Sequence, residues 1–224
     1  MNMNKIKDTV KHLSFMLSIP ALNVFYLLLN NPDRGVHSLV TDIDRSLPFL
    51  SIFILPYSSW YIFIFATLVY LCFRDRKTYY NALASVNISL IICYLIYFFY
   101  QTTVPRPVLA GNDFFTQMVT WVYKNDQPFN CFPSIHCLLS YLMVVAINTS
   151  KIKNRKNIFI IGSIAVLIIL STLFVKQHVL LDALAAMLLG DIIYKVVYNF
   201  NQGKVLQWIK RPSLLWTTKR KYEI

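Results

Sequence analysis

The sequence predicts an all-α protein of the membrane, a bundle of about six transmembrane helices with a further helix on the outer membrane surface. Apolar residues make up 56% of the 224 residues and charged residues 14%, and the mean hydropathy is +0.50. These proportions are far from those of soluble domains. Apolar runs close to the roughly 20 residues that cross a hydrocarbon core recur along the chain.

The predicted spans cover residues 13–30, 48–73, 81–101, 134–149, 157–175 and 179–200. The fourth run is short, but it leads from a polar loop into the charged run KIKNRK, and Pro133 suits the first position of a helix. The first run lacks a small-residue cleavage site close behind it, which favours a retained helix over a removed signal peptide.

Lysine and arginine predict the orientation, because they are enriched in cytoplasmic loops. Seventeen of the 22 fall in or beside one alternate set of connections, and five fall in the other set: Arg34, Arg45, Arg106, Lys124 and Lys176. We therefore expect a multi-pass protein of the plasma membrane with both termini in the cytoplasm and with outer loops around 31–47, 102–132 and 176–178. Without the fourth span, KIKNRK would move outward and spoil this pattern.

We expect one membrane-embedded domain over residues 1–224, in which short turns such as RDRK pair antiparallel helices. The net charge of +12 lies at membrane edges, above all in a basic cytoplasmic tail at 201–224. Anionic lipid is therefore a better partner than nucleic acid, although ordinary positive-inside flanks explain the same charges.

The four cysteines have no metal-ligand spacing, and only Cys131 lies clearly in an outer loop, so no disulfide framework is indicated. The oligomeric state is left open.

The long outer loop at 102–132 contains the predicted surface helix. The segment NDFFTQMVTWVYKND has apolar residues at helical spacing, namely Phe114, Met118, Trp121 and Val122. Such a helix either lies on the outer leaflet or packs on the top of the bundle.

Ionisable side chains inside apolar spans are costly to bury and are therefore functional candidates. They gather on the outer side, at Arg106, His136 and the segment 176–182. His178 and Asp182 are four residues apart, so if the last helix has begun they share a face, and Asp182 can accept a hydrogen bond from the ring. This bond would fix the tautomer and raise the basicity of the other ring nitrogen. A polar pair that bridges two helices has the same spacing, and Asp191 on the same helix is read as a flank or packing residue.

The stretch FPSIH adds a second histidine. If Pro133 opens a helix, the unpaired amides at its start favour an anion. Ser134 offers a hydroxyl group, and His136 lies in the first turn. A lone histidine at a helix start is more often a cap or packing residue, but together with Arg106 and Lys176 it forms a cluster of donors and cations.

Two uses of these residues compete. A divalent metal could be held by His136, His178 and Asp182. Alternatively, a phosphate could be bound by Arg106, Lys176 and helix amides, and attacked by His178. The cations favour phosphate, because a guanidinium and an ammonium repel a metal but neutralise a phosphoryl group in its transition state. We therefore expect no required metal or other cofactor.

The same residues resemble the motifs of the type 2 phosphatidic acid phosphatase superfamily, which are K-x6-R-P, P-S-G-H and S-R-x5-H-x3-D. Arg106 and Pro107 look like the end of the first motif. Residues 133–136 match the second with isoleucine in place of glycine, and the third keeps its spacing in Ser171, His178 and Asp182. The order, the spacing and the helical layout agree over about residues 50–200, the expected catalytic core.

The resemblance implies a helical core of four to six antiparallel helices and a set of catalytic roles. His178 attacks phosphorus to form a phosphohistidine, Asp182 orients His178, and His136 protonates the leaving oxygen, after which water normally resolves the intermediate. By similarity, the phosphoryl oxygens are bound by Arg106, Ser134 and Ser171.

Two positions depart from the family pattern. The lysine of the first motif falls at Phe99 and the arginine of the third at Thr172. Lys176 is a candidate replacement cation, and Gln101 a candidate neutral donor. Losing these cations lowers activity or marks a branch whose acceptor is not water, as in the family's phosphorylinositol and phosphocholine transferases.

We therefore expect a metal-independent membrane lipid phosphatase that acts on a lipid phosphate or a polyprenyl pyrophosphate at the outer face. A lipid phosphotransferase with the same site is the alternative within enzymes. A lipid-binding protein, a transporter or an inactive family member is the alternative outside catalysis. Charged residues that line a transport pathway would occur at several depths, whereas these cluster at one membrane edge, which favours a site.

Overall fold

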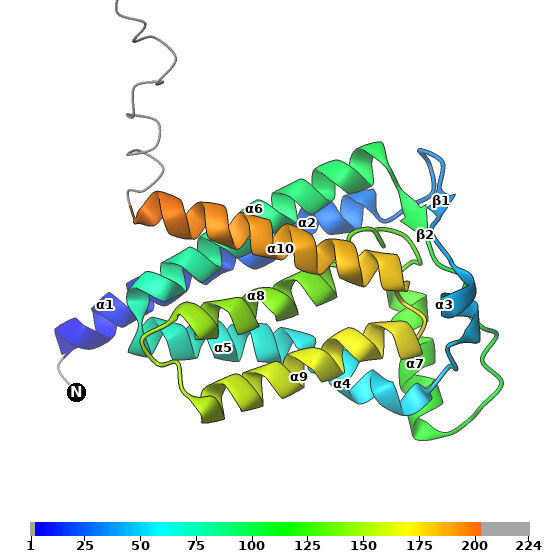
Figure 1. Cartoon of the computed structure of the whole chain (residues 1–224). Coiled ribbons are helices and arrows are strands. Elements are labelled where there is room, and N and C mark those ends of the chain that lie inside the picture. Colours follow the sequence, from blue (N-terminus) through cyan, green and yellow to red (C-terminus); the bar gives the residue numbers. More distant parts are fainter. Residues whose placement is uncertain (1–2, 203–224) are drawn as a thin grey trace, which may run out of the picture.

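A computed structural model of the chain describes residues 3–202, and the predicted basic tail at 201–224 lies almost wholly outside them. The fold is helical, and its long helices run roughly alongside one another (Figure 1). In chain order the elements are α1 (Met3–Ser14), η1 (Phe15–Leu17), α2 (Ser18–Leu29), β1 (His37–Ser38), α3 (Asp42–Ser46), η2 (Ser51–Phe53), α4 (Ile54–Ser58), α5 (Trp60–Arg74), α6 (Arg76–Phe99), β2 (Thr102–Thr103), α7 (Phe114–Asn125), α8 (Ile135–Thr149), α9 (Arg155–Phe174) and α10 (Leu180–Asn201).

The all-α class is confirmed, and the helices are those of a membrane protein. Within residues 3–202, four helical stretches are long and apolar enough to cross a membrane: Asp8–Leu29, Ser51–Arg74, Arg76–Phe99 and Arg155–Phe174. The α8 helix is apolar but has 15 residues. The α10 helix has 22 residues and carries Asp182, Asp191 and Lys195, and it is not one of the four. The count of six spans therefore stays a prediction.

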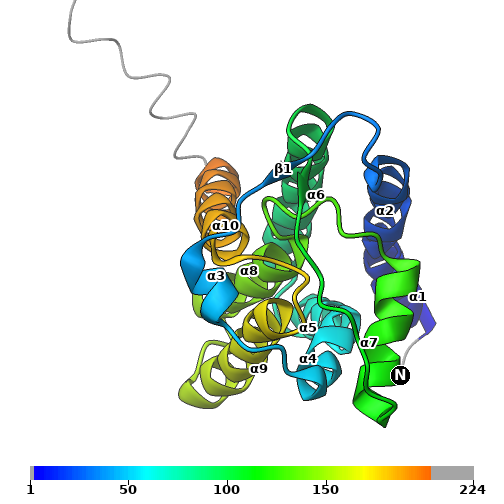
Figure 2. The same cartoon turned by 90° about the vertical axis from the view of Figure 1, so that its right-hand side faces the viewer.

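The α8 helix lies at the centre of the bundle. It contacts α5, α6, α9 and α10, and Figure 2 shows these helices end-on around it. Its side chains Leu138, Leu142, Met143 and Ile147 are fully buried. Because protein surrounds this helix, an apolar run too short to be an obvious span still lies within the core.

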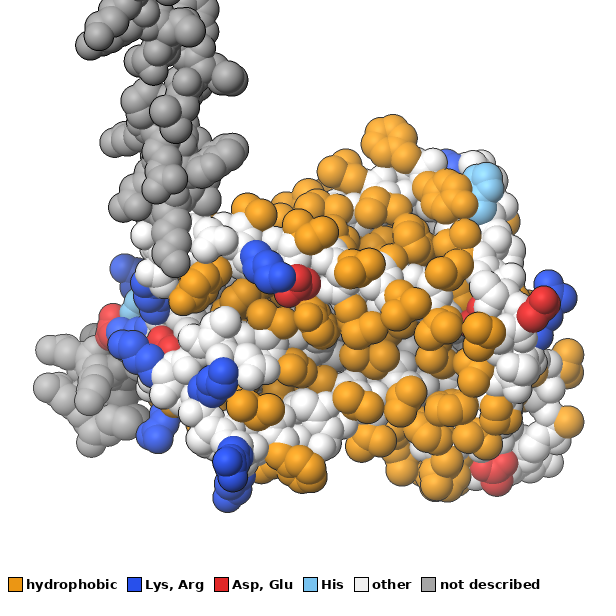
Figure 3. All heavy atoms as spheres, in the orientation of Figure 1, with side chains coloured by type: hydrophobic (Ala, Val, Ile, Leu, Met, Phe, Trp, Pro, Cys, Tyr) orange, Lys and Arg blue, Asp and Glu red, His pale blue; other side chains and the backbone are white. Residues whose placement is uncertain are grey.

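The lateral surface of the bundle, along the sides of the long helices, is apolar in its middle and charged toward its ends. Large hydrophobic side chains are exposed on several helices, among them Ile62 (74%), Phe159 (74%) and Leu188 (67%). Figure 3 shows hydrophobic side chains across this face and lysines and arginines gathered at one end, where α5 joins α6 and α8 joins α9. Such an apolar belt suits contact with lipid.

The opposite end is closed by short elements that are distant in the sequence. Strand β1 pairs with β2 in parallel, with His37 opposite Thr102 and Ser38 opposite Thr103. Together with α3, α7 and the α9–α10 connection, this pair lies at the end where α8 and α10 begin (Figures 1 and 2).

The predicted helix in the 102–132 loop is present as α7. Its Val119 is buried, and Met118 and Val122 pack beside it in the cluster that contains Ile54 and Val175. Two other residues of the predicted apolar face remain exposed, since Phe114 and Trp121 are each 66% accessible. One side of α7 thus packs on the end of the bundle, and its contact with a membrane surface stays a prediction.

Candidate active site

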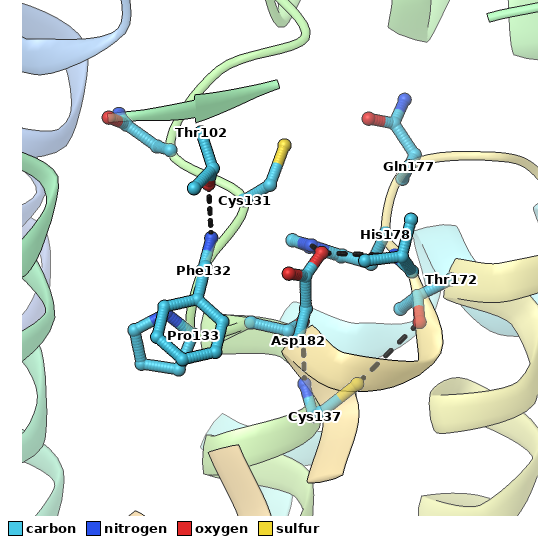
Figure 4. A network of polar contacts seen from close by, with 12 residues as sticks. Thr102, Cys131, Phe132, Pro133, Cys137, Thr172, Gln177, His178 and Asp182 are labelled. Atoms are coloured by element: carbon cyan, nitrogen blue, oxygen red, sulfur yellow. Dashed lines mark hydrogen bonds and ion pairs between the residues drawn. The ribbon is translucent and has the colours of Figure 1, made fainter. Parts of the chain in front are cut away.

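The connection between α9 and α10 carries His178, and the first turn of α10 carries Asp182. The Asp182 Oδ2 atom accepts the amide of Val179 at 3.0 Å and lies 3.3 Å from the His178 Nδ1 atom (Figure 4). The two side chains therefore meet, but they do not share a helix face as the four-residue spacing suggested. Helix α10 begins at Leu180, so the carboxylate at its third position reaches back over the helix start to the preceding loop.

This contact orients the ring of His178. With a proton on Nδ1, the ring donates to Asp182, and Nε2 then carries the free lone pair. Within residues 3–202, Nε2 has no hydrogen-bond partner. Both side chains are buried, with 8% of His178 and 1% of Asp182 accessible. A base or nucleophile held in this way needs no reorganisation before it reacts.

His136 lies in the first turn of α8, as predicted, although Pro133 does not open this helix. Ser134 is the N-cap, and its hydroxyl oxygen accepts the Cys137 amide at 3.3 Å, so Pro133 precedes the cap. The Ser134 amide donates to the backbone carbonyl of Asp182 at 3.2 Å. This bond joins the start of α8 directly to the start of α10, and it fixes the second histidine near the first.

The two imidazole rings face one region of the molecule. Their centroids are 5.7 Å apart, and the ring of His136 packs against Tyr57 at 4.7 Å and Trp60 at 4.3 Å. No hydrogen bond from the His136 ring to the described part of the chain is present. A ligand group that lies between the two rings can therefore contact a free nitrogen of His136 and the free Nε2 of His178.

Both histidines line a cavity of about 420 Å³, together with aromatic residues from α2, α4, α5 and α7. Its described lining contains one carboxylate, that of Asp126, and no lysine or arginine. The Asp126 Oδ1 atom accepts hydrogen bonds from the Tyr26 hydroxyl at 2.8 Å and from Asn30 Nδ2 at 2.9 Å. Burial raises the pKa of Asp126, although the Tyr26 hydrogen bond and the charge of Arg106 act in the opposite direction.

Arg106 lies beside this cavity and is held by oxygen atoms of the protein. Its guanidinium donates to the backbone carbonyls of Tyr123 (3.2 Å) and Asp126 (2.7 Å) and to Gln177 Oε1 (2.6 Å). It also lies over the Tyr123 ring, 4.3 Å from the centroid. Burial raises the pKa of Tyr123 to about 12, although the charge of Arg106 acts to lower it. Arg106 thus joins the end of α7 to the residue that precedes His178.

Lys176 is also held by backbone oxygens. Its φ of 53° is in the left-handed region, and its ammonium donates to the carbonyls of Asp44 (2.9 Å) and Leu47 (2.7 Å). Burial lowers the pKa of Lys176, and the charge of Asp44 acts against this. Lys176, Arg106 and His178 line a second cavity of about 280 Å³. His178 therefore lies between an aromatic cavity and a second cavity whose charged lining consists of Arg45, Arg106, Lys176 and Asp44.

Asp44, which the sequence did not single out, supports the same loop. Its Oδ1 atom accepts the Leu180 amide at 2.8 Å, and its Oδ2 atom accepts the amide (2.8 Å) and hydroxyl (2.6 Å) of Thr41. Burial acts to raise the pKa of Asp44, but these hydrogen bonds outweigh it and lower the pKa. The carboxylate thereby connects α3 to the first residue of α10.

The side chains of Ser171 and Gln101, two further candidate donors to phosphate, are each held by oxygen atoms of the protein. The Ser171 hydroxyl donates to the Ile168 carbonyl at 2.6 Å and is fully buried. The Gln101 side chain donates to the Leu29 carbonyl and to Asn130 Oδ1, both at 2.8 Å. Neither side chain lines the cavity that the two histidines share.

The two positions that lack the family's cations also differ in their surroundings. Phe99 ends α6 and is 80% exposed. Thr172 is buried in α9, and its carbonyl accepts the amides of Gln177 (3.0 Å) and His178 (3.1 Å). Thr172 therefore shapes the loop through its backbone, while Phe99 makes no contribution to the cavity lining.

Residues 3–202 contain no group of three or more histidine, cysteine, aspartate or glutamate residues that could hold a metal ion. The four cysteines are buried and free. Asp191, predicted as a flank or packing residue, forms an ion pair with Lys195 at 2.5 Å.

Comparison with known proteins identifies the family. The sequence pattern of the PAP2 superfamily matches residues 79–205, more than half of the chain. The chain belongs to the PAP2 superfamily. The match confirms the resemblance to type 2 phosphatidic acid phosphatases, and the PAP2 region contains His136, His178 and Asp182. PAP2 membership supports phosphatase-type chemistry in a membrane protein.

This PAP2 protein is similar to an uncharacterized protein of Methanocaldococcus jannaschii. The two are 25% identical over 185 residues, which are 81% of this chain and 70% of that protein. No solved structure matches this chain.

Proposed function

We propose that this PAP2 protein cleaves a lipid phosphate or a polyprenyl pyrophosphate through a phosphohistidine on His178. The observation that carries the proposal is the pairing of the His178 Nδ1 atom with Asp182 at 3.3 Å, with His136 across a shared cavity. This arrangement leaves one free ring nitrogen directed away from the carboxylate, as a nucleophile requires.

In the proposed reaction the Nε2 lone pair of His178 attacks phosphorus, and the bond from phosphorus to the leaving oxygen breaks. The leaving oxygen takes a proton from His136. A water molecule then attacks phosphorus and gives a proton to His136, while the phosphorus–nitrogen bond breaks and phosphate is released. Asp182 stabilises the positive charge that develops on His178, as a carboxylate does for the histidine of a catalytic triad.

Arg106 and Lys176 are proposed to act beside the phosphoryl group. Both are held by oxygen atoms of the protein, but each keeps a free donor: Arg106 Nε has no hydrogen-bond partner in the described chain, and the Lys176 ammonium has three N–H groups. Direct binding of a phosphoryl oxygen therefore does not require an exchange of the present hydrogen bonds. Their charges also lower the energy of an anion near His178. Ser134 and the amides at the start of α8 are the proposed neutral donors, and Ser171 would first have to leave the Ile168 carbonyl.

We propose that the site opens at the outer face of a plasma membrane. The support is the uneven charge: lysines and arginines gather at the end of the bundle opposite the cavity (Figures 1 and 3), as expected for a cytoplasmic end. The same basic end is the proposed contact with anionic lipids.

A second candidate is a lipid phosphotransferase, in which an alcohol takes the place of water. Two observations favour it: the family's cations are replaced at Phe99 and Thr172, and the described lining of the histidine cavity has no lysine or arginine. Such a cavity is less suited to a doubly charged phosphate than to a singly charged phosphodiester.

The test is a panel of lipid phosphates supplied to the purified protein, with and without a chelator and with and without alcohol acceptors. The proposal predicts release of inorganic phosphate in the presence of the chelator. A phosphorylated acceptor would identify the transferase. Release that requires an added divalent metal would contradict the metal-independent mechanism.

A further inference from the structure

We infer that a groove between α5 and α9 binds one hydrocarbon chain of an anionic phospholipid, whose head group lies at the basic end of the bundle. The groove shares no lining residue with the cavity of the two histidines. The inference therefore goes beyond the reaction proposed at His178 and does not depend on it. It rests on the proposed contact between the basic end and anionic lipids, and it assigns that contact to a defined binding site.

The groove lies on the lateral surface of the bundle and has a volume of about 580 Å³. Both of its helices lie in stretches that are long and apolar enough to cross a membrane. Most of its wall is apolar, including Ile62, Phe63 and Ala66 of α5 and Ile160, Ile164 and Leu167 of α9. Because Ile62 is 74% exposed and Leu167 is 48% exposed, the groove opens to the side, where lipid surrounds a membrane-spanning bundle.

The length of the groove matches a hydrocarbon chain in one leaflet. On α9 the lining extends from Asn157 to Leu167, roughly 15 Å at about 1.5 Å per residue. One leaflet contributes about half of a hydrocarbon core of roughly 30 Å. The chain leaves other lipid for a wall that is equally apolar, so it gains packing contacts but little selectivity among lipids. Selectivity therefore has to come from the polar end of the groove.

The polar end is formed by Tyr70 and Asn157. The Asn157 Nδ2 atom donates to the Tyr70 hydroxyl at 3.2 Å, which joins the two sides of the groove, and to the Ile152 carbonyl at 2.7 Å. The Tyr70 hydroxyl donates to no acceptor within residues 3–202. Its hydrogen is thus available to an ester or phosphate oxygen of a lipid.

Two cations extend the two sides of the groove beyond this end. Arg74 is four residues after Tyr70 on α5, and Lys156 is four residues before Ile160 on α9, so each lies on the groove face of its helix. Both side chains are exposed, and neither forms an ion pair with the described part of the chain. They lie where α5 ends and α9 begins, at the end of the bundle at which lysines and arginines gather (Figure 3). An anionic head group at Tyr70 therefore meets two unpaired positive charges.

The same charges disfavour a second copy of this chain in the groove. Oligomers of identical chains are mostly related by two-fold axes, which place the same surface of each copy against the other. Such an arrangement would bring Arg74 and Lys156 of the two copies together, and like charges repel. Charge complementarity therefore favours an anionic lipid as the occupant.

Lipid binding to the purified full-length protein tests the inference. Native mass spectrometry compares phosphatidylglycerol, which is anionic, with phosphatidylcholine of the same acyl chains, in a His178→Ala background that cannot form the proposed phosphohistidine. We expect phosphatidylglycerol to bind at least about tenfold more tightly, and the double replacement Arg74→Gln and Lys156→Gln to remove most of this difference. The matched control replaces Lys151 and Lys153 by glutamine, since both are exposed cations of the α8–α9 connection. Equal losses in the two double variants would indicate unspecific attraction and overturn the inference.

A second pair of variants tests the groove itself. Ala66→Trp fills the groove from α5, whereas Val166→Trp adds the same side chain to α9 outside the lining, where Val166 is 55% exposed. We expect Ala66→Trp to weaken phosphatidylglycerol binding several-fold and Val166→Trp to leave it nearly unchanged. Equal binding by these two variants would contradict the groove as the binding site.

A photoreactive lipid locates the chain without any substitution in the groove. Phosphatidylglycerol with a diazirine in one acyl chain is irradiated with the His178→Ala protein, and the labelled peptides are identified by mass spectrometry. We expect label on the peptides of α5 and α9 that line the groove. Label absent from both helices, or a dimer that carries no lipid, would count against the inference.

The two proposals fail in different ways. Groove binding by a chain that cleaves no lipid phosphate would contradict the proposed function alone. Cleavage of lipid phosphates by a chain that binds no anionic lipid in the groove would contradict this inference alone.

Discussion

One oxygen of Asp182 serves both the start of a helix and the orientation of a histidine. The Oδ2 atom lies 3.0 Å from the Val179 amide nitrogen and 3.3 Å from His178 Nδ1. The fold of the α9–α10 connection and the chemistry of His178 are therefore linked through a single side chain. Asparagine keeps an oxygen at this position but removes the charge, so the structural role and the proposed catalytic role of the carboxylate can be tested separately.

Replacement of Asp182 by asparagine should impair turnover far more than folding. The amide oxygen of asparagine can still accept the Val179 amide, so we expect a small change in melting temperature. The charge that stabilises a protonated His178 is lost, and kcat should fall by roughly 10²- to 10⁴-fold. The control is Asp191→Asn on the same helix, where the carboxylate pairs with Lys195. A variant at Asp182 that keeps more than about a tenth of its activity would remove this carboxylate from the mechanism.

Replacement of His136 by glutamine should have an effect that depends on the leaving group. If His136 protonates the leaving oxygen, the loss should be about 10²-fold or more for an alkyl lipid phosphate. It should be much smaller for a nitrophenyl ester, whose leaving oxygen needs no proton. The comparison is His37→Gln, since His37 is exposed on β1 and stacks on Tyr100. Equal losses on both kinds of ester would indicate a packing role for His136.

The stability of the α9–α10 connection should depend on the ionisation of Asp44. Its hydrogen bonds lower its pKa below the usual 3.8, so the ionised form stabilises the fold. That contribution is complete above the unfolded-state pKa and is lost as the pH falls through the lower folded-state pKa. At about pH 7, Asp44→Asn should therefore be less stable than the wild type by about 1–2 kcal/mol, as for other helix-start contacts.

Thermal unfolding in detergent at a series of pH values measures this contribution. The difference between the wild type and Asp44→Asn should shrink as the pH falls well below 3.8. Asp42→Asn is a suitable control, because the side chain of Asp42 is fully exposed in its contact with Arg45. A difference that grows toward acid pH would have the wrong sign for this account.

The outer position of the 102–132 loop can be tested with a new cysteine. The four native cysteines are buried, whereas Val108 is 97% exposed. A membrane-impermeant maleimide added to intact cells should label Val108→Cys. It should label Lys153→Cys, in the α8–α9 connection, only after the cells are opened. The reverse pattern would turn the site toward the cytoplasm.

Much of the fold follows from local patterns in the sequence. Runs of apolar residues predict the long helices, because a helix that contacts lipid or a buried core needs such residues all round. The four-residue spacing of His178 and Asp182 predicts that they meet, although the helix starts later than that argument assumes. Pro133 misled the prediction of a helix start, because a proline also fits just before an N-cap, and the cap here is Ser134.

The rest depends on contacts that no local pattern contains. Asp126 meets Tyr26 across 100 residues of sequence, and Asp44 meets Leu180 across 136. No local pattern predicts that the Lys176 ammonium contacts two carbonyls of the α3 region. The aromatic wall of the cavity likewise comes from four helices, so its chemistry exists only once they pack.

The most direct test of the account is whether His178 forms a covalent bond to phosphorus. The enzyme is mixed with a lipid substrate radiolabelled at phosphorus, quenched with alkali, and digested for mass spectrometry. We expect an acid-labile label on the peptide that contains His178. In His178→Ala, the label should be absent and turnover should be at least about 10³-fold lower. A label on another residue, or a His178→Ala variant that retains most of its turnover, would contradict the central claim.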